Sequence, residues 1–326
     1  MTRAIRVISL FTMCAVIAAC GPSAATPPPT ATAPAPTVPP TVVVATPTLP
    51  PPTALPSVTT PPDATVTPAT TPEGKPTPVA RITLSEVAPS ESTPGVIRIS
   101  GKAQVFEAML VVELHGPQDE IIAKGYARAS IGAPEWGDFS VDLFYTPPAS
   151  PTRAILQAYE PSPKDGSPNS LVTAPVMLVP APELARWQPF DNATFGFSVR
   201  YPTDWHLNQG SIMPAPPAAT KLSTYQAQTP GQLPAEKDAE VWITVSDVPS
   251  LAEMENLARM GYRQATVVVG GHPGVRYTAP QPVFGVYDVV YTLSGRREYR
   301  IQLSANTHQY DATFNLILAT FSTREQ

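Results

Sequence analysis

The chain has 326 residues, 43% of them apolar, and a formal net charge of −5. Such a mildly acidic chain lacks the basic surface of nucleic-acid-binding proteins and the polybasic run that holds proteins on anionic membranes. The length allows about two ordinary domains. Nearly half of the 43 prolines lie in the first eighty positions, so we expect the folded part to follow them.

Residues 1–19 have the pattern of a secretory signal peptide. Two arginines precede an apolar run over 7–19, which is too short to cross the roughly 30 Å core of a bilayer as a permanent helix. The sequence IAACG at its end resembles a bacterial lipobox. The resemblance implies cleavage between Ala19 and Cys20, and a diacylglycerol thioether on Cys20. A plain signal peptide with an unrelated cysteine is the alternative.

Cys14 and Cys20 are the only cysteines. Cys14 lies in the leader, so the body of the protein can contain no disulfide framework. Two or three acyl chains on Cys20 would anchor the protein stably. We therefore expect an extracytoplasmic protein attached to the cell membrane by a lipidated N-terminal cysteine, with the choice between inner and outer membrane left open.

Residues 20–80 combine this anchor with a Pro/Thr-rich stalk, as in TPPPTATAPAPTVPP. Proline fixes φ and removes a backbone donor, so neither a helix nor a sheet can propagate. The composition predicts a disordered linker that favours polyproline II. Its role is either a stiffened spacer that carries the folded domains away from the membrane or a passive tether.

Residues 81–180 contain short apolar or alternating runs separated by Gly and Pro. In the run FSVDLFY, every second residue is apolar, so one face of the strand is buried. A series of this kind predicts an all-β immunoglobulin-like sandwich. The runs cover 82–87, 96–100, 109–114, 121–126, 139–145, 154–159 and 171–178.

Three segments of this domain carry a family resemblance: IRISGKAQVFEAMLVVEL, GDFSVDLFY and AYEPSPKDGSPNSLVTAPVMLV. Together they resemble the immunoglobulin-like family Gmad2 over 82–179. The family is known from bacterial spore-germination and cell-envelope proteins. The resemblance implies a non-catalytic module for interactions at the envelope.

Two residues of this domain are candidate binding residues. Trp136 lies beside Gly137 in a polar loop, where an indole can contact a ligand. Asp165 lies in PSPKDGSPNS, which fits a turn better than a calcium loop, because the regular oxygen spacing of an EF-hand is missing. The four histidines are far apart, without zinc-type spacing, so we predict no metal site and no cofactor.

Residues 185–326 predict an α+β domain with an antiparallel sheet. Ser250 and Glu253 have the spacing of a capping box that opens a helix over 250–260, and a second helix is expected over 310–320. Gly270 and Gly271 predict a hairpin turn. The expected strands cover 195–201, 239–245, 265–269, 274–277, 286–293 and 298–305.

The order of FGF, YPTDW, GHPGVRY and a final helix that ends in Thr-Phe resembles the PsbP-like fold over 189–322. The resemblance implies a domain type that also occurs in bacterial lipoproteins. We expect Tyr201, Pro202 and Trp205 to be core and turn residues rather than ligands. The run VWITV likewise favours the core for Trp242 over an exposed glycan-binding position.

The chain has no GxSxG elbow and no P-loop, and we predict no catalytic residues. We expect a non-enzymatic protein that presents two interaction modules to the cell wall, a glycan or another envelope protein, and that binds no nucleic acid. The alternative is a surface hydrolase with its active site in the C-terminal domain. A cleft with a histidine and a carboxylate in hydrogen-bond reach would favour that alternative.

Overall fold

The computed structural model describes residues 80–90, 93–210, 219–226 and 235–324, all of which belong to the unit Pro72–Gln326. The predicted signal peptide, the cleavage site at Ala19 and Cys20, and the stalk lie outside the described residues. No helix in the described part of the chain is long and apolar enough to cross a membrane.

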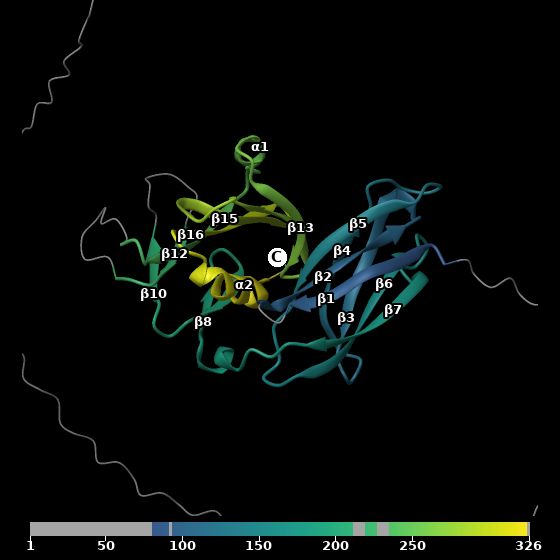
Figure 1. The fold of residues 1–326 in the computed structure, drawn as a ribbon, viewed down its shortest axis with the longest axis horizontal. Helices are drawn as coiled ribbons and strands as arrows, with labels where there is room; N and C mark the ends of the chain where they lie inside the picture. Colours follow the sequence, from purple (N-terminus) through teal and green to yellow (C-terminus); the bar gives the residue numbers. More distant parts are fainter. Residues whose placement is uncertain (1–79, 91–92, 211–218, 227–234, 325–326) are drawn as a thin grey trace, which may run out of the picture. The chain divides into compact units, whose positions relative to one another are not determined.

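The first half of the unit, which we call the Ig-like half, is a sandwich of two antiparallel sheets (Figure 1). One sheet has the order β1-β2-β5 and the other β4-β3-β6-β7. All seven strands predicted from the alternating runs are confirmed. They are β1 (Ile82–Ser90), β2 (Thr93–Ala103), β3 (Met109–His115), β4 (Ile121–Arg128), β5 (Gly137–Phe144), β6 (Thr152–Pro161) and β7 (Pro168–Leu178).

Alternation along each strand decides which side chains enter the core of this sandwich. In β2, Ile97 and Ile99 are fully buried between the sheets, while Arg98 between them faces outward. In β3, Leu110, Val112 and Leu114 are likewise buried in the core of the sandwich. Burial of such side chains stabilises the sandwich by roughly 1.5–3 kcal/mol each, so the core needs no disulfide.

The second half, which we call the C-terminal half, is mostly antiparallel sheet with two short α-helices, α1 (Leu251–Arg259) and α2 (Asp311–Thr320). Its main strands have the order β13-β14-β15-β16-β12-β11-β10, and a small sheet has the order β17-β9-β8. The strands are β8 (Gln188–Asn192), β9 (Phe197–Tyr201), β10 (His206–Gly210), β11 (Ala219–Ser223), β12 (Ala239–Ser246), β13 (Arg263–Val269), β14 (His272–Thr278), β15 (Val283–Ser294), β16 (Arg297–Ala305) and β17 (Ser322–Thr323).

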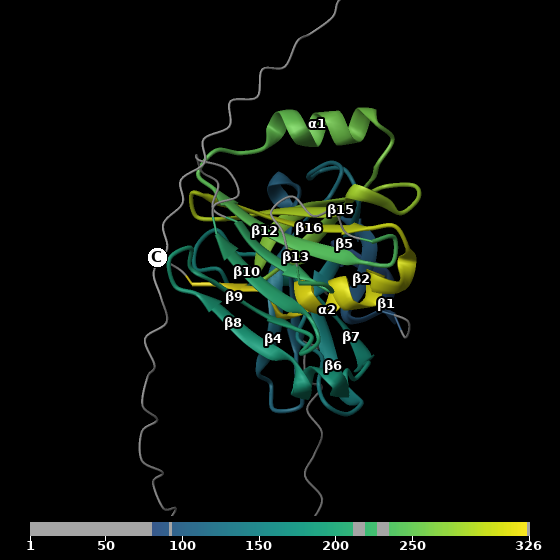
Figure 2. The same cartoon turned by 90° about the vertical axis from the view of Figure 1, so that its left-hand side faces the viewer.

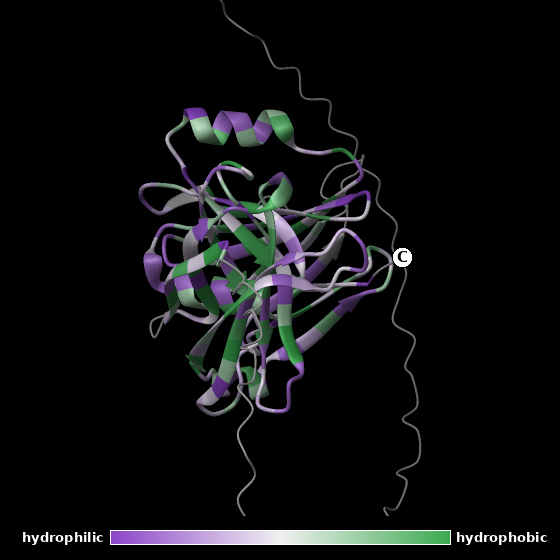
Figure 3. Cartoon of the chain, turned by 90° about the vertical axis from the view of Figure 1, so that its right-hand side faces the viewer, coloured by the Kyte–Doolittle hydropathy of each residue, from purple (hydrophilic) through white to green (hydrophobic). Residues whose placement is uncertain are grey.

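The two helices cover opposite faces of this sheet (Figure 2). α2 and the small sheet bury the larger core, in which Phe314 and Ile317 meet Phe197 and Ile301. α1 covers the other face through Leu257. Hydrophilic and hydrophobic residues alternate along α1 (Figure 3), as expected for a helix with one face on the sheet.

Both predicted helices are confirmed, but the predicted capping box is wrong. The Ser250 side chain does not cap α1; its hydroxyl and its backbone N–H both donate to the buried carboxylate of Glu298, at 2.5 and 3.1 Å. Glu253 instead accepts from Arg300 at 2.7 Å. The Glu298 carboxylate from β16 thus takes the hydrogen bonds that Ser250 would make to the first turn of α1. The sequence of the helix alone cannot reveal this exchange.

The two halves are joined through their sheets. β5 pairs in parallel with β13, with Asp142 opposite Val267 and Leu143 opposite Val268, so a single ten-stranded sheet runs through both halves (Figure 1). Side chains cross the junction in both directions: Val268 packs in the core of the Ig-like half, and Phe144 in the core of the C-terminal half. The halves therefore share buried side chains as well as backbone pairing.

The segment between the halves is also packed. It forms a 3-10 turn, Pro182–Arg186, whose Leu184 is buried with Ala181 against Leu316 of α2. Further along α2, the backbone carbonyl of Ala319 accepts a hydrogen bond from the Thr146 hydroxyl at 3.1 Å. α2 therefore contacts both halves and fixes the connection between them.

Candidate functional site

A cavity of about 740 Å³ opens where the two halves meet, and we call it the central cleft. β1, β2 and β5 form one wall, and β13, β14, β15 and the start of α2 form the other. Seven charged side chains of both signs and one histidine lie in the lining. They are Glu86, Arg98, Asp142, Arg263, Arg276, Asp288, Asp311 and His308.

Arg276 is the best-fixed of these groups. Its Nε and Nη2 donate to the two carboxylate oxygens of Asp288 at 2.9 and 2.6 Å, and its Nη1 donates to Asn315 at 2.8 Å. Its guanidinium lies over the rings of Phe144 and Phe314, at 5.9 and 5.7 Å from their centroids. Burial opposes the charge, but attraction to Asp288 outweighs it and raises the pKa of Arg276.

Arg98 forms a similar fork on the opposite wall. Its Nε and Nη2 donate to the two oxygens of Asp142 at 2.8 and 3.0 Å. The hydrogen bond and the charge of Asp142 raise the pKa of Arg98. Bidentate pairs of this kind hold planar groups in fixed positions, so the cleft presents rigid walls with hydrogen-bonding edges.

At the rim, Tyr287, His308 and Asp311 form a polar triplet. The Tyr287 hydroxyl lies 2.7 Å from His308 Nδ1 and 3.2 Å from Asp311 Oδ2, and His308 Nδ1 lies 2.9 Å from Asp311 Oδ2. Nδ1 can accept from Tyr287 or donate to Asp311, but not both at once. Burial, followed by the charge of Asp311, raises the pKa of Tyr287. The triplet places a histidine and a carboxylate in hydrogen-bond reach.

One oxygen of this triplet lacks a partner. Asp311 Oδ1 is buried and has no hydrogen-bond partner among the described residues, and the nearby Thr307 hydroxyl is in the same situation. Buried polar atoms without partners are uncommon and destabilising. Two buried oxygen atoms, one of Asp311 in the lining and one of Thr307 four residues before it, therefore have no hydrogen-bond partner among the described residues.

The two candidate binding residues of the Ig-like half do not line the central cleft. Trp136 keeps 40% of its surface exposed just before β5. Asp165 lies in the exposed turn between β6 and β7, where its Oδ1 accepts from the Ser167 hydroxyl at 2.7 Å and from the Ser167 N–H at 3.1 Å. These bonds lower the pKa of Asp165. They are the bonds of a local turn, so the structure agrees with the turn interpretation.

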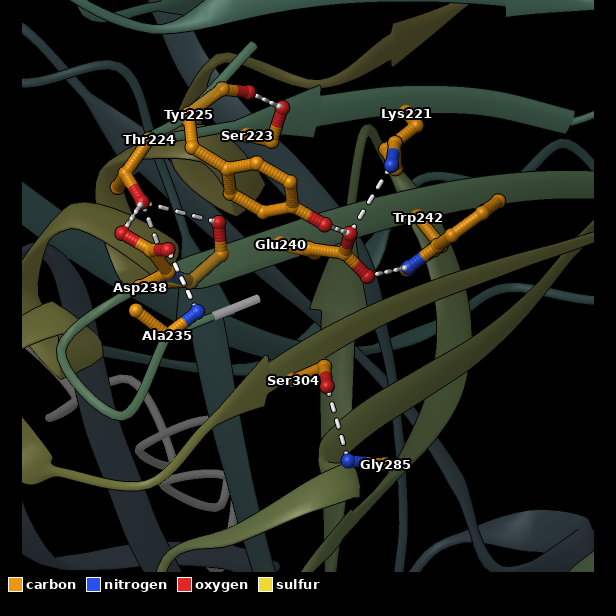
Figure 4. Close-up of polar contacts among 11 residues, drawn as sticks. Lys221, Ser223, Thr224, Tyr225, Ala235, Asp238, Glu240, Trp242, Gly285 and Ser304 are labelled. Atoms are coloured by element: carbon orange, nitrogen blue, oxygen red, sulfur yellow. Dashed lines mark hydrogen bonds and ion pairs between the residues drawn. The ribbon is translucent and has the colours of Figure 1, made fainter. Parts of the chain in front are cut away.

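The predicted core position of Trp242 is wrong. Val241, Ile243 and Val245 take the core face of β12, and period-2 alternation turns Trp242 to the opposite face, where it is half-buried. Its indole N–H donates to Glu240 at 2.9 Å, and Lys221 Nζ lies 3.0 Å from the same carboxylate (Figure 4). In contrast, Tyr201 and Trp205 are buried as predicted.

Glu240 is the centre of this cluster. The Tyr225 hydroxyl also donates to it, and the Lys221 ammonium lies 5.3 Å from the ring centroids of both Tyr225 and Trp242. Burial and the neighbouring carboxylate raise the pKa of Tyr225. Because the polar groups are satisfied within the cluster, we assign it a structural role.

A further ionic cluster lies on the Ig-like half. The buried carboxylate of Glu113 accepts from Tyr159 at 2.8 Å, pairs with Lys124 at 2.7 Å and contacts His115 Nε2 at 3.1 Å. His115 Nδ1 contacts Asp119 at 2.9 Å. Both ring nitrogens of His115 thus face carboxylates. Among the described residues, however, no group of three or more potential ligands is arranged to hold a metal ion.

The lining of the central cleft was not predictable from the sequence. Arg98 and Arg276 lie in the runs IRISGKAQVFEAMLVVEL and GHPGVRY, which indicate a fold and not a site. His308 lies in no motif, and the three residues are far apart along the chain. Pairing of β5 with β13 brings the elements that bear them together. Asp311 and His308 are three residues apart, but such a pair is common on helix surfaces.

Comparison with known proteins supports the assignment of the first half. Residues 82–167 match the family Gmad2, described as an immunoglobulin-like domain of bacterial spore germination. The matched region contains β1 to β6, and β7 follows it directly. The predicted immunoglobulin-like domain is thereby confirmed. No curated protein matches the chain.

Proposed function

We propose that this protein is a lipid-anchored binding protein of the bacterial cell envelope, which holds a polar ligand in the central cleft without transforming it. The observation that carries the proposal is the construction of the cleft. Its two walls come from different halves, and the β5–β13 pairing fixes them in one sheet. A binding site gains affinity when its walls are already in place before the ligand arrives.

The pattern of residues 1–80 supports the location. A basic start, a short apolar run and the IAACG sequence favour lipidation of Cys20, and the Pro/Thr-rich segment favours a spacer that presents the folded unit away from the membrane. The match of residues 82–167 to a family described for spore germination supports a bacterial envelope setting.

A PsbP-like assignment of residues 185–326 is part of the proposal. An antiparallel sheet with α1 on one face and α2 on the other supports it. The assignment adds no activity to the protein. It makes the C-terminal half a second non-catalytic module, which forms one wall of the cleft.

The cleft favours a neutral or zwitterionic ligand rich in hydroxyl and amide groups, such as cell-wall glycan. Its volume of about 740 Å³ lies within the roughly 300–1,000 Å³ of typical ligand sites. Arg276 and Arg98 are already paired with Asp288 and Asp142. Paired groups keep free edges for hydrogen bonds to an uncharged ligand, whereas an anionic ligand that bound to Arg276 or Arg98 would have to break the pairs.

The test is co-sedimentation of the purified protein with isolated cell-wall sacculi. Arg263 lines the cleft and is exposed, so Arg263→Glu should weaken retention without unfolding the protein. The matched control is Arg128→Glu, on an exposed residue of β4 outside the cleft. Saturable retention that Arg263→Glu alone reduces would support the proposal. Equal retention of wild type and both variants would exclude the cleft as the binding site.

The polar triplet favours a second candidate function, a hydrolase. Asp311 can orient His308, and the exposed ring of His308 can then act as a general base. Neither Ser nor Cys is among the described residues that line the cleft, and no hydrogen bond is made between His308 and the lining threonines Thr93 and Thr278 in the described part of the chain, so we take water as the nucleophile. Release of soluble fragments from sacculi by wild type, lost in His308→Gln, would establish this function over simple binding.

A further inference from the structure

A second hollow, of about 900 Å³, lies beside the turn that joins β15 to β16, and we call it the hairpin pocket. It is separate from the central cleft, with which it shares no lining residue. The ends of β12, β14 and β17 complete its walls. Its lining includes the polar residues Asp247, His272, Ser294, Arg296, Arg297 and Arg324.

The arginines of this pocket are incompletely neutralised. Arg324 pairs with Asp191, which lies outside the lining. Arg297 Nε is 3.9 Å from the exposed carboxylate of Asp247, too far for a hydrogen bond. Arg296 forms no ion pair with the residues that the structure describes. The hairpin pocket therefore retains excess positive charge.

One nitrogen of the Arg297 guanidinium group lacks a hydrogen-bond partner. Its Nη1 is buried and has no hydrogen-bond partner in the described part of the chain. The forks of Arg98 and Arg276 in the same protein are both engaged by carboxylates. A guanidinium nitrogen without an acceptor leaves Arg297 with unused hydrogen-bonding capacity, and 31% of its side-chain surface stays exposed, so an acceptor in the pocket can reach the guanidinium group.

The opposite side of the pocket is held in place by hydroxyl groups. The Thr323 hydroxyl lies 2.6 Å from His272 Nε2 and 3.2 Å from the Ser294 hydroxyl. These contacts tie the end of the chain to the turn and to β14. They fix the Ser294 hydroxyl in the lining, beside the two arginines that follow Gly295.

We infer that the hairpin pocket binds a phosphate group, with Arg297 and Arg296 as its main ligands. The planar fork of arginine matches the oxygens of phosphate. A tetrahedral oxyanion offers acceptors in several directions, so it can serve Arg297, Arg296 and Ser294 together. A carboxylate has its two oxygens in one plane and can serve only one fork fully. The phosphate can be inorganic phosphate or the phosphate ester of a small alcohol or sugar.

The test is titration of the full-length protein by isothermal calorimetry with inorganic phosphate, glycerol 3-phosphate and succinate. The variants are Arg297→Gln and the independent Arg296→Gln, which alters an exposed residue and should leave the fold intact. The matched control is Arg259→Gln, on an exposed residue of α1 outside the pocket. Thermal unfolding of each variant reports whether the fold is preserved.

We expect saturable binding of phosphate by wild type and by Arg259→Gln. Each pocket variant should bind about tenfold more weakly, the loss expected when one charged hydrogen bond is removed. Equal binding of both phosphates would identify the phosphate group alone as the ligand, and tighter binding of glycerol 3-phosphate would identify an ester. No saturable binding by wild type, equal binding by folded pocket variants, or equal binding of succinate would overturn the inference.

Discussion

The side chain of Val268 occupies the space that a Cβ atom on Gly125 would need. Gly125 belongs to β4 of the Ig-like half, whereas Val268 belongs to β13 of the C-terminal half, yet Val268 is fully buried in the core of the Ig-like half. Because Gly125 has no side chain, the methyl groups of Val268 from the other half can fill this space.

This match predicts compensation between two substitutions. Gly125→Ala should destabilise the protein by about 1–3 kcal/mol, because it overpacks the core, and Val268→Ala by about 2 kcal/mol, because it leaves a cavity. The double variant should lose about 1 kcal/mol less unfolding free energy than the two single variants lose together. Urea denaturation of all three proteins measures the coupling. Val248→Ala, at a position 73% exposed, is the control; strictly additive losses would contradict the proposed contact.

A second prediction concerns cooperativity. Because the halves share a sheet and exchange core side chains, they should unfold in a single transition. Hydrogen exchange in increasing denaturant can follow amides of β3 and of β16, which lie in different halves. We expect both strands to lose protection at the same denaturant concentration. Separate midpoints would show that the β5–β13 pairing does not couple the halves.

A third prediction concerns Arg276 in the central cleft. Arg276→Met would leave the buried carboxylate of Asp288 without its partner, and breaking a buried pair costs about 3–5 kcal/mol. The exposed pair Lys102–Asp138 provides the control, since Lys102→Met should cost less than about 1 kcal/mol. Thermal or urea unfolding measures the loss of stability in each of the two variants. Similar small losses in both variants would mean that Arg276 is less important for stability than its contacts indicate.

A fourth prediction concerns pH. Burial disfavours the charged form of His115, but its hydrogen bonds to Glu113 and Asp119 outweigh burial and raise the pKa of His115 above its ordinary 6.5. The charged form therefore stabilises the fold fully below 6.5, and this contribution is lost as the pH rises through the folded-state pKa.

His115→Gln should accordingly differ from wild type most at mildly acidic pH and least at alkaline pH. Urea unfolding across this range measures the difference, and NMR titration of the ring gives the pKa directly. His206→Gln, at an exposed position of β10, is the matched control. A difference that grows with rising pH would contradict the assigned contacts. Glu113 has a lowered pKa, so its own contribution is lost only in stronger acid.

Local sequence patterns predicted most strands because their signals are local. Alternation marks β5 and β12, and Gly270 and Gly271, both with positive φ, make the turn between β13 and β14. The same patterns missed β8, β10, β11 and β17, which are short and rich in polar residues. Alternation in VWITV is equally compatible with Trp242 inward or outward, and the neighbouring valines and isoleucine decided the register.

The central cleft was beyond prediction for a different reason. Its lining depends on the pairing of β5 with β13, and nothing in either strand specifies which partner will lie at its edge. The helix begins after Ser250 as predicted, but the side-chain contacts of the capping box could not be predicted for the same reason, since the buried Glu298 from another strand takes the hydrogen bonds of Ser250. Residue spacing predicts contacts between residues that are close along the chain. The lining of the central cleft and the hydrogen bonds of Ser250 both depend on residues that are distant in sequence.

The β5–β13 pairing also sets the order in which the fold can be completed. β13 begins more than a hundred residues after β5 ends, so the Ig-like half cannot be finished until the C-terminal half is also available to fold. Until then the Ig-like half has an open strand edge at β5 and an unfilled place where Val268 belongs. An open edge of this kind can pair with other chains, so the two halves protect the protein from association only when both are present.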